Sequence, residues 1–536
     1  MPMSSSQRYP VWLYTLAVVA WLLVSVLPLG IMLIRFGVRV VEDPSVLTKV
    51  FLDTRQWVLM GRSLGIAALA TGFALLLGLP MARMLAAHDL PGRRGLCTLV
   101  LMPLLIPAHV MAVAWIHLLS PTGWVNQLWT GLLGLSTRLS MHSSLGCAWT
   151  LASTYFPVIA FLVATGLVKM DTCQHEAMRL STGRWGVFRH ATLPQIFPYV
   201  LASSCLVMIF ILAQYGVPSL LGINTYPVEI FAEFSAFYDE AAATAKAIPL
   251  TVIVVVLIVF QRALMRHSDY VSFLPSSEIS KPVGLDRFRY GAAGMLIFVF
   301  VFLLVIPFAS VLTHTQSISA VIEALRSSRG CITSTGVLAF WAAIFSTALA
   351  FPIGHLLACK RDGWIRWLDV LCWLPIAIPG TIAGLGYVQL SNRLPALQRA
   401  DSFGLFLLCA YVGMFSAFSI RIFEATFRRM DINMAEAAAV FGCPWWRRLC
   451  TIDIPVQVGA IATSMIVVFA LALGELNATV LLIPPGKETL AVTIDNLLHY
   501  GANVRGSVLC LTTALVVVGM IGGGGLVGSL IRRQTK

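Results

Sequence analysis

Charged residues are scarce in this chain. Asp, Glu, Lys and Arg together make up 11% of its 536 residues, while hydrophobic residues make up 58%. A typical soluble domain carries about 25% charged residues. The chain also lacks a polar segment large enough to fold as a nucleotide-binding domain. These two absences argue against a soluble enzyme and favour a protein that crosses a membrane several times.

Three further absences narrow the function. The eleven cysteines form no C-x-x-C pair, so the sequence indicates neither a disulfide framework nor a zinc site. No G-x-x-x-x-G-K-S/T motif occurs, because Gly486-Lys487 lacks both the upstream glycine and the following Ser or Thr. The net charge of +13 is not gathered with aromatic residues on a soluble domain, as a nucleic-acid-binding face requires. We therefore expect this chain to hold no cofactor, metal or nucleic acid.

Long apolar segments are abundant. Since about 20 apolar residues carry a helix across the hydrocarbon core, we predict an all-α polytopic membrane protein with about 12 transmembrane helices. The first apolar run is too long for a signal peptide and lacks a cleavage site, so we interpret it as a membrane anchor. The predicted spans are 11–35, 63–87, 96–120, 145–168, 195–222 and 245–264, followed by 291–313, 334–358, 367–391, 404–424, 456–484 and 507–531.

Basic residues predict the orientation of these spans. An even number of spans with a cytoplasmic N-terminus places most of the 37 Lys and Arg residues in the inner segments, as the positive-inside tendency requires. Both chain ends are then cytoplasmic. The polar, basic segment 265–290 is interpreted as a cytoplasmic linker between two halves.

The two halves repeat one another. Pro103 and Pro107 in the third span are matched by Pro375 and Pro379 in the ninth, in a Pro-x-x-x-Pro pattern both times. Such prolines, like Pro80 in the second span, are tolerable where neighbouring helices satisfy the freed carbonyls. The repeat predicts two pseudo-symmetric six-helix halves with a transport pathway at their interface.

A loop follows the same span in each half. The second loop runs from Glu436-Ala437-Ala438 through Gly442 to Ile454-Pro455. Its alanines favour a helix, its glycine permits a sharp turn, and its proline suits the entry to the next span. We expect two short helices lying across the membrane surface. Trp445 and Trp446 would anchor the second of them, as Trp185 would in the first loop.

The first loop is a weaker copy. Aligned on Pro194, it has His175 where the glutamate belongs and Ser181 where the glycine belongs. Aligned on Glu176-Ala177, it is one residue short, and Gly183 is a nearby glycine. The sequence alone leaves both alignments open.

An acidic, alanine-rich turn, a small residue and a closing Leu/Ile-Pro between membrane helices resemble the EAA loop of ABC-importer permeases, where the membrane subunit touches its ATPase. The resemblance covers nearly the whole chain. Its fused form is most similar to the ferric-iron permeases and their thiamine and aminoethylphosphonate relatives. Three further segments carry the resemblance: Tyr215–Gly222, Leu473–Thr479 and Pro484–Leu490.

The resemblance implies the type I ABC importer transmembrane fold. Residues 59–264 and 333–531 would form two ABC transmembrane type-1 domains. Residues 1–58 would hold the anchor helix and a periplasmic loop, and residues 291–332 would hold the seventh helix and its periplasmic loop. Residues 265–290 remain the linker.

Partners and cargo follow from the same resemblance. A cytoplasmic ABC ATPase dimer would bind ATP and Mg, so this chain is expected to be a transport subunit and not an enzyme. A periplasmic solute-binding protein would deliver the cargo to the bacterial inner membrane, whose lipid surrounds the spans. Ferric iron is the first candidate cargo, with thiamine and aminoethylphosphonate as alternatives. The ATPase-coupling residues would be His175, Glu176, Ala177, Ser181, Gly183 and Pro194, and Glu436, Ala437, Ala438, Gly442 and Pro455.

An ion-driven secondary transporter of twelve helices is the alternative class. The segment Asp89–Arg94 partly matches an acidic-Gly-Arg-Arg signature of the major facilitator family. However, the preceding glycine and the basic residue after the aspartate are missing, and the second half has no clear counterpart. This alternative also leaves the repeated loops unexplained.

Polar residues inside spans are the candidates for the pathway, because they are costly in lipid and usually face the bundle interior. Glu475 and Asn477 in the eleventh span come first, followed by Gln214 in the fifth. The alternative for these three is a hydrogen bond that holds helices together. His109 and His117 in the third span are interpreted as structural.

Overall fold

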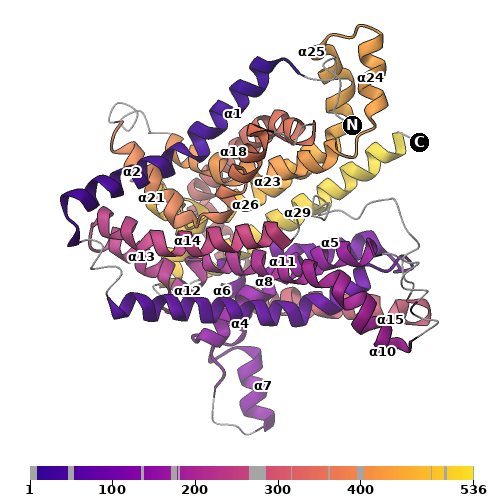
Figure 1. Ribbon diagram of the computed structural model, residues 1–536. Helices are drawn as coiled ribbons and strands as arrows, with labels where there is room; N and C mark the ends of the chain where they lie inside the picture. Colours follow the sequence, from indigo (N-terminus) through magenta and orange to yellow (C-terminus); the bar gives the residue numbers. More distant parts are fainter. Residues whose placement is uncertain are drawn as a thin grey trace.

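The computed structural model describes residues 9–45, 53–133, 138–170, 178, 182–264, 285–315, 317–359, 363–394, 404–484, 486–499 and 504–534. Every regular element within these residues is a helix. The long helices run side by side as a bundle (Figure 1). Most of the predicted linker, residues 265–284, lies outside the described residues.

Nine helices among the described residues are long and apolar enough to cross a membrane, or up to 12 spans exist if each of three bent pairs counts as one. The predicted positions of the spans are therefore confirmed. Six are single helices: α4 (Thr54–Leu85), α8 (Ser144–Val168), α14 (Glu240–Leu264), α18 (Arg329–Cys359), α23 (Leu405–Phe427) and α29 (Val504–Gln534). Short helices connect them: α7 (Trp124–Leu133), α12 (Gly216–Leu220), α13 (Tyr226–Ser235), η3 (Asp286–Phe288), α17 (Ile318–Ser327), α24 (Ile432–Val440), α27 (Thr479–Leu482) and α28 (Leu490–His499).

Three spans contain a five-residue π-helical segment that ends two positions before a proline. A proline has no N–H and its ring crowds the preceding turn, and a π segment widens the helix at that point. A π segment precedes Pro194, Pro307 and Pro455 in this way. These spans are α10–η2–α11 (Arg184–Val187, Phe188–Thr192, Leu193–Leu212), α15–η4–α16 (Arg289–Phe300, Val301–Val305, Ile306–Thr313) and α25–η6–α26 (Trp445–Arg448, Leu449–Asp453, Ile454–Leu473).

Three spans are broken. The first bends by 46° between α1 (Val11–Ser25) and α2 (Leu27–Glu42). The third bends by 92° between α5 (Arg93–Leu105) and α6 (Ala108–Leu118). Pro107 lies directly before α6. The ninth bends by 101° between α19–α20 (Trp364–Leu371, Leu374–Ala377) and α21 (Gly380–Ser391), again next to a proline, Pro379. Pro107 and Pro379 thus lie at the breaks, each as the N-cap of the following helix, whereas Pro80 and Pro103 lie inside helices.

Two predicted boundaries were wrong. The fifth and eleventh spans were expected to run to residues 222 and 484, but their helices end at Leu212 and Leu473. A short break follows each, and the chain continues as α12 and α27. A continuous apolar run hides such breaks, because hydropathy reports burial in lipid and not the path of the backbone.

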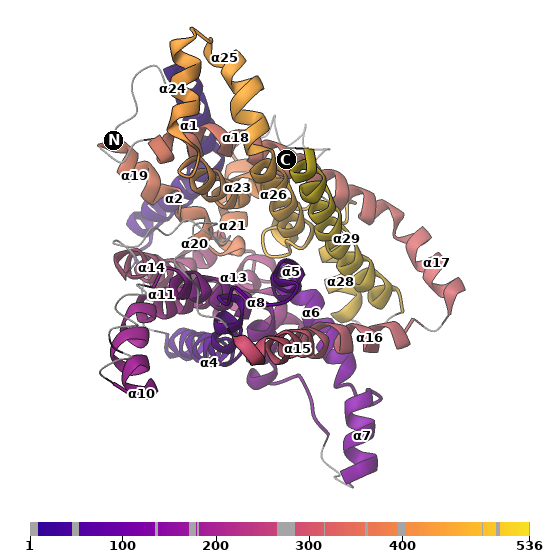
Figure 2. The same ribbon diagram turned by 90° about the vertical axis from the view of Figure 1, so that its right-hand side faces the viewer.

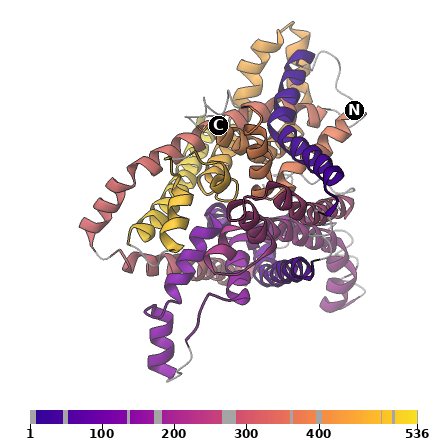
Figure 3. The same cartoon turned by 90° about the vertical axis from the view of Figure 1, so that its left-hand side faces the viewer.

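The first helices of each half pack on the opposite half. Helices α1 and α2 contact α18, α21 and α23, while α15 and α16 contact α5 and α6. The indole N–H of Trp21 donates to Oγ of Ser416 at 3.1 Å, and the Ser25 hydroxyl donates to the Gly413 carbonyl at 3.0 Å. Figure 3 shows α1 and α2, in indigo, lying across the helices of the second half. The two halves are therefore interlocked and not merely adjacent.

The repeat is also visible in individual hydrogen bonds. The backbone N–H of Tyr226, which begins α13, donates to Oγ of Ser63 at 2.8 Å. In the second half the N–H of Leu490, which begins α28, donates to Oγ1 of Thr335 at 2.7 Å. Helices α13 and α28 therefore occupy matching places, in agreement with the predicted pseudo-symmetry.

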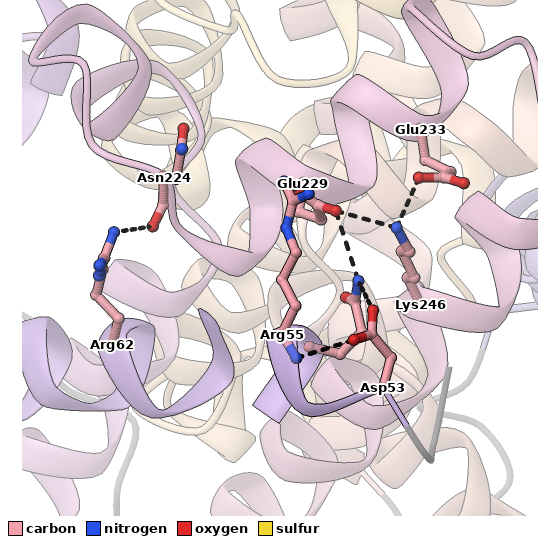
Figure 4. A network of polar contacts seen from close by, with 8 residues as sticks. Asp53, Arg55, Arg62, Asn224, Glu229, Glu233 and Lys246 are labelled. Carbon is pink, nitrogen blue, oxygen red and sulfur yellow. Dashed lines mark hydrogen bonds and ion pairs between the residues drawn. The ribbon is translucent and has the colours of Figure 1, made fainter. Parts of the chain in front are cut away.

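A charged network surrounds α13 in the first half (Figure 4). The ammonium of Lys246, on α14, lies 3.1 Å from Glu229 and 2.6 Å from Glu233, both on α13. Arg55, on α4, reaches the other oxygen of Glu229 at 3.1 Å. The network joins three helices, and because Lys246 is almost fully buried, removing its carboxylate partners would leave an uncompensated buried charge, which costs more than breaking an exposed ion pair.

Candidate functional site

The second loop forms a helical hairpin. Helix α24 begins with Asp431, whose carboxylate accepts from the N–H of Asn433 at 3.0 Å, as an N-cap does. The helix ends before Gly442, which has φ +66°, a left-handed conformation that glycine adopts without strain. The chain then reverses into α25, and Figure 2 shows α24 and α25 side by side, projecting from the bundle. The predicted helix and sharp turn are confirmed.

The expectation of a second, separate surface helix was wrong. Residues Trp445–Leu473 form one continuous helix, so α25 is the projecting end of the eleventh span. The π segment before Pro455 explains why the helix continues: it accommodates the proline without a break. We call α24 and α25 together the hairpin.

The tip of the hairpin is apolar and exposed. Val440 is 84% exposed and Phe441 is 87% exposed, and Trp446 and Met434 are also exposed. Glu436, Ala437 and Gly442 face solvent, whereas Ala438 is buried. Exposed apolar side chains that cluster on a projecting element are typical of a surface that binds a partner.

Only the end of the first loop is described. His175, Glu176, Ala177 and Ser181 lie outside the described residues. Gly183 stands directly before α10, and Pro194 lies in the first turn of α11. Trp185 is 71% exposed, and its ring stacks on Phe188 with centroids 5.5 Å apart. These aromatic side chains therefore form an exposed surface at the first loop as well.

The breaks in the third, fifth and eleventh spans meet where the two halves face each other. A β-carbon on Gly474 would overlap the Pro107 ring, and one on Gly216 would lie 2.8 Å from Leu476. The backbone N–H of Tyr215 donates to Oδ1 of Asn477 at 3.1 Å. First-half residues thus contact second-half residues directly at the break points, and these contacts were not predicted from the sequence.

Glu475 lies at the start of two short helices. Its Oε1 accepts from the N–H of Ala478 at 2.9 Å, just before α27. The same oxygen would be 2.8 Å from a β-carbon on Gly380, the first residue of α21. Helix N-termini favour a carboxylate, so the backbone supplies a reason for an acidic residue here. A role of Glu475 in transport remains a prediction.

The other pathway candidates also have partners. Gln214 donates from its side-chain amide to the Tyr155 hydroxyl, and Asn477 accepts from Tyr215 across the halves. Gln214 occupies the place of Glu475 in the repeat, counted from the matching prolines that open α11 and α26. This position of the repeat therefore holds a neutral residue, Gln214, in the first half and an acidic residue, Glu475, in the second.

The two histidines of the third span are buried. His109 lies next to Gly216, with its Cβ 3.5 Å from a β-carbon placed there. His117 pairs with the Ser507 hydroxyl at 3.2 Å, and its ring lies 4.4 Å from that of His314. His109 therefore packs next to α12, and His117 contacts α29 and the end of α16.

A buried charged network in the second half was missed. Arg421, on α23, contacts Glu424 at 2.7 Å and Asp369 at 2.5 Å, and its guanidinium lies 4.6 Å from the centre of the Trp373 ring. Arg262, near the end of α14, also pairs with Asp369. Charged residues inside predicted spans were the available signal, because they are rare there. The network links the last helix of the first half to the second half.

Asp89, the acidic residue of the major-facilitator-like segment, has a structural role. Its carboxylate accepts from the N–H of Leu285 at 2.8 and 2.9 Å. Leu285 is the first described residue of the predicted linker, residues 265–290. The contact therefore fastens the end of the linker to the first half.

Comparison with known proteins finds that the chain is similar to transport permeases. The sequence profile of the family described as "Binding-protein-dependent transport system inner membrane component" matches residues 74–269. The Fe(3+)-transport system permease protein FbpB 2 of Haemophilus influenzae is 23% identical over 434 residues, which cover 78% of this chain and 80% of that protein. The thiamine transport system permease protein ThiP of Salmonella typhimurium is 21% identical over 460 residues, covering 81% and 82%. The putative 2-aminoethylphosphonate transport system permease protein PhnV of Salmonella paratyphi A is 29% identical over 186 residues, covering 34% and 68%.

Proposed function

This chain is an ABC-importer permease of the binding-protein-dependent type with both halves fused, and from that premise we propose that it carries a small solute inward under the control of a separate ATPase. The observation that carries the proposal is the hairpin. It projects from the bundle (Figure 2) and exposes Val440 and Phe441 at its tip. An ATPase subunit with an apolar groove would bury these side chains and so dock at this place.

The proposed orientation puts the hairpin and α10 in the cytoplasm. This choice is supported by the basic residues, most of which fall in the inner segments when both chain ends are cytoplasmic. Helices α13 and α28 then lie on the periplasmic side, where a solute-binding protein would dock. ATP and Mg would be bound by the ATPase dimer and not by this chain.

In the proposed mechanism, ATP binding draws the two loops together and opens the pathway toward the binding protein, and hydrolysis resets it. The contacts between Gly474 and Pro107 and between Tyr215 and Asn477 join the halves at the breaks in the spans. Separation of the halves would have to part these contacts. We therefore propose that they close the pathway, with Glu475 and Gln214 beside it.

Ferric iron is the first candidate cargo. It is supported by a relative named for Fe(3+) transport that aligns over 80% of its own length. Thiamine is supported by a relative aligned over 82% of its length, and aminoethylphosphonate by a shorter match of higher identity. We propose that selection among such cargoes belongs to the binding protein, because it meets the solute first.

Uptake of labelled ferric iron, thiamine and aminoethylphosphonate should be compared in cells with and without this chain. Loss of ferric iron uptake alone is the expected result. Loss of one of the other two would correct the cargo and leave the permease in place. Uptake that persists after the partner ATPase is inactivated would instead favour an ion-driven transporter.

A further inference from the structure

Tyr9, two residues before α1, contacts a buried ion pair at the base of the hairpin. The hydroxyl of Tyr9 donates to Oδ2 of Asp453 at 2.6 Å, and Nε of Arg448 donates to the same oxygen at 3.0 Å. The Arg448 guanidinium also lies 4.9 Å from the centre of the Tyr9 ring. Tyr9 and Asp453 are 2% exposed and Arg448 is 3% exposed. Residues 444 positions apart in the sequence thus meet in one closed cluster.

Neighbouring aromatic residues extend this contact. The ring of Trp12, on α1, meets that of Trp445, on α25, edge to face with centroids 5.7 Å apart. The Tyr14 hydroxyl lies 2.8 Å from Nδ1 of His355, on α18, and the Tyr9 ring lies 4.6 Å from the same imidazole. The segment Tyr9–Tyr14, which we call the strap, therefore joins α25 and η6 to α18.

The chemistry of the cluster depends on Tyr9. A buried carboxylate is stable only when its oxygens accept hydrogen bonds. Tyr9 donates one such hydrogen bond to Asp453, beside the one from Arg448. Burial, reinforced by the Asp453 carboxylate, raises the pKa of Tyr9. The hydroxyl therefore stays protonated and keeps donating.

The described part of the first loop has no matching ion pair. The segments α10–η2–α11 and α25–η6–α26 have equal lengths of 4, 5 and 20 residues, so their positions correspond. Val187 stands in the place of Arg448 and Thr192 in the place of Asp453. Near the start of α15, the first helix of the second half, Tyr290 is 66% exposed. The buried pair and its tyrosine thus belong to the second loop.

We infer that Tyr9 is a positioning residue for the second loop: the strap sets the angle at which the hairpin leaves the bundle and transmits its motion to α1. Since α1 packs on α18 and α23, a displaced hairpin would move helices of the second half through the strap. The inference rests on the proposed docking of an ATPase at the hairpin. It makes the two loops unequal in their described residues: the strap holds the second, whereas Val187 and Thr192 leave the first without the buried pair.

Hydrogen exchange of the full chain in lipid nanodiscs tests the contact without any partner. Tyr9→Phe removes one donor and keeps the ring, and Tyr290→Phe is the matched control. In Tyr9→Phe, amides of residues 445–453 should exchange about tenfold faster, the effect of losing a hydrogen bond to a charged group, while α18 and α23 stay protected. Equal exchange in both variants, or faster exchange spread evenly over α18 and α23, would overturn the inference.

A second readout tests the positioning role. The full chain is assembled with its ATPase, and ATP hydrolysis is measured for both variants. Tyr9→Phe should lower the maximal rate several-fold with an unchanged KM for ATP, while Tyr290→Phe matches the parent. Parental hydrolysis in Tyr9→Phe despite faster local exchange would refute positioning. If the parent chain itself binds no ATPase, the proposed function fails, and hydrogen exchange still decides whether the strap holds the hairpin.

Discussion

Substitutions at Gly442 test how the hairpin is built. With φ +66°, Gly442 has a conformation that costs an alanine about 1–2 kcal/mol. No atom lies within 4 Å of a β-carbon placed there, so the cost is one of backbone conformation and not of a clash. Such a cost changes the population of the correctly folded turn by a factor of about 5–30. Asparagine tolerates this conformation better than alanine does.

Transport should therefore fall in the order Gly442→Asn, Gly442→Ala, Gly442→Asp. The aspartate also places a charge beside the apolar tip, and we expect it to abolish transport while the chain still inserts. Gly459→Ala is the matched control, since Gly459, on α26, also has open space around it and has no left-handed φ. The assay is ATP-dependent uptake, normalised to the amount of inserted chain. Full activity of Gly442→Ala, or equal losses in the alanine and asparagine variants, would refute the reasoning.

Three other substitutions give separate tests. Gly474→Ala should impair uptake strongly, because its methyl group overlaps the Pro107 ring; unchanged uptake would show that the halves part there easily. Glu475→Gln should slow transport if the charge matters, and parental uptake would leave the residue with its hydrogen bond to the backbone alone. Burial raises the pKa of the Asp495 carboxyl to about 6, and this effect is larger than the opposing effect of nearby His499. The folded state therefore favours the protonated acid, and its stability falls as the pH rises through this pKa. Asp495→Asn should raise the melting temperature by a few degrees at about pH 8, where the parent carboxyl is charged, and should give no such gain near pH 4. Equal gains at both pH values would contradict this.

The sequence was sufficient for the positions of the spans and for the helix and turn that begin the second loop. Length and hydropathy located the spans, because a helix in lipid must satisfy its own backbone. Ala437 to Ala439 predicted a helix and Gly442 predicted the turn, since both depend on local conformational preference. Neither inference required knowledge of distant residues.

Features that depend on long-range packing were not predicted. The prolines marked the third and ninth spans, but the bends of 92° and 101° depend on how α6 and α21 pack in the bundle. The contact of Tyr9 with Asp453 joins residues that lie 444 positions apart in the sequence. Glu475 was identified as a polar residue inside a span, yet its position at the start of α21 and α27 required the structure.

The two halves share a fold but differ in their buried charges. In the first half, Lys246 and Glu229 form an ion pair near α13, whereas the matching places on α14 and α13 are taken by Cys510 and Thr493 in the second half. The second half holds Arg448 with Asp453 at the opposite end of the bundle. Pseudo-symmetry of the backbone is therefore combined with an unequal distribution of ionic contacts, which the repeat in the sequence did not indicate.

The most direct test of the central claim is uptake into proteoliposomes that contain this chain, its ATPase and its binding protein. Our account predicts that uptake of labelled ferric iron requires ATP hydrolysis and is lost with Gly442→Asp. Uptake driven by an ion gradient without the ATPase would contradict it.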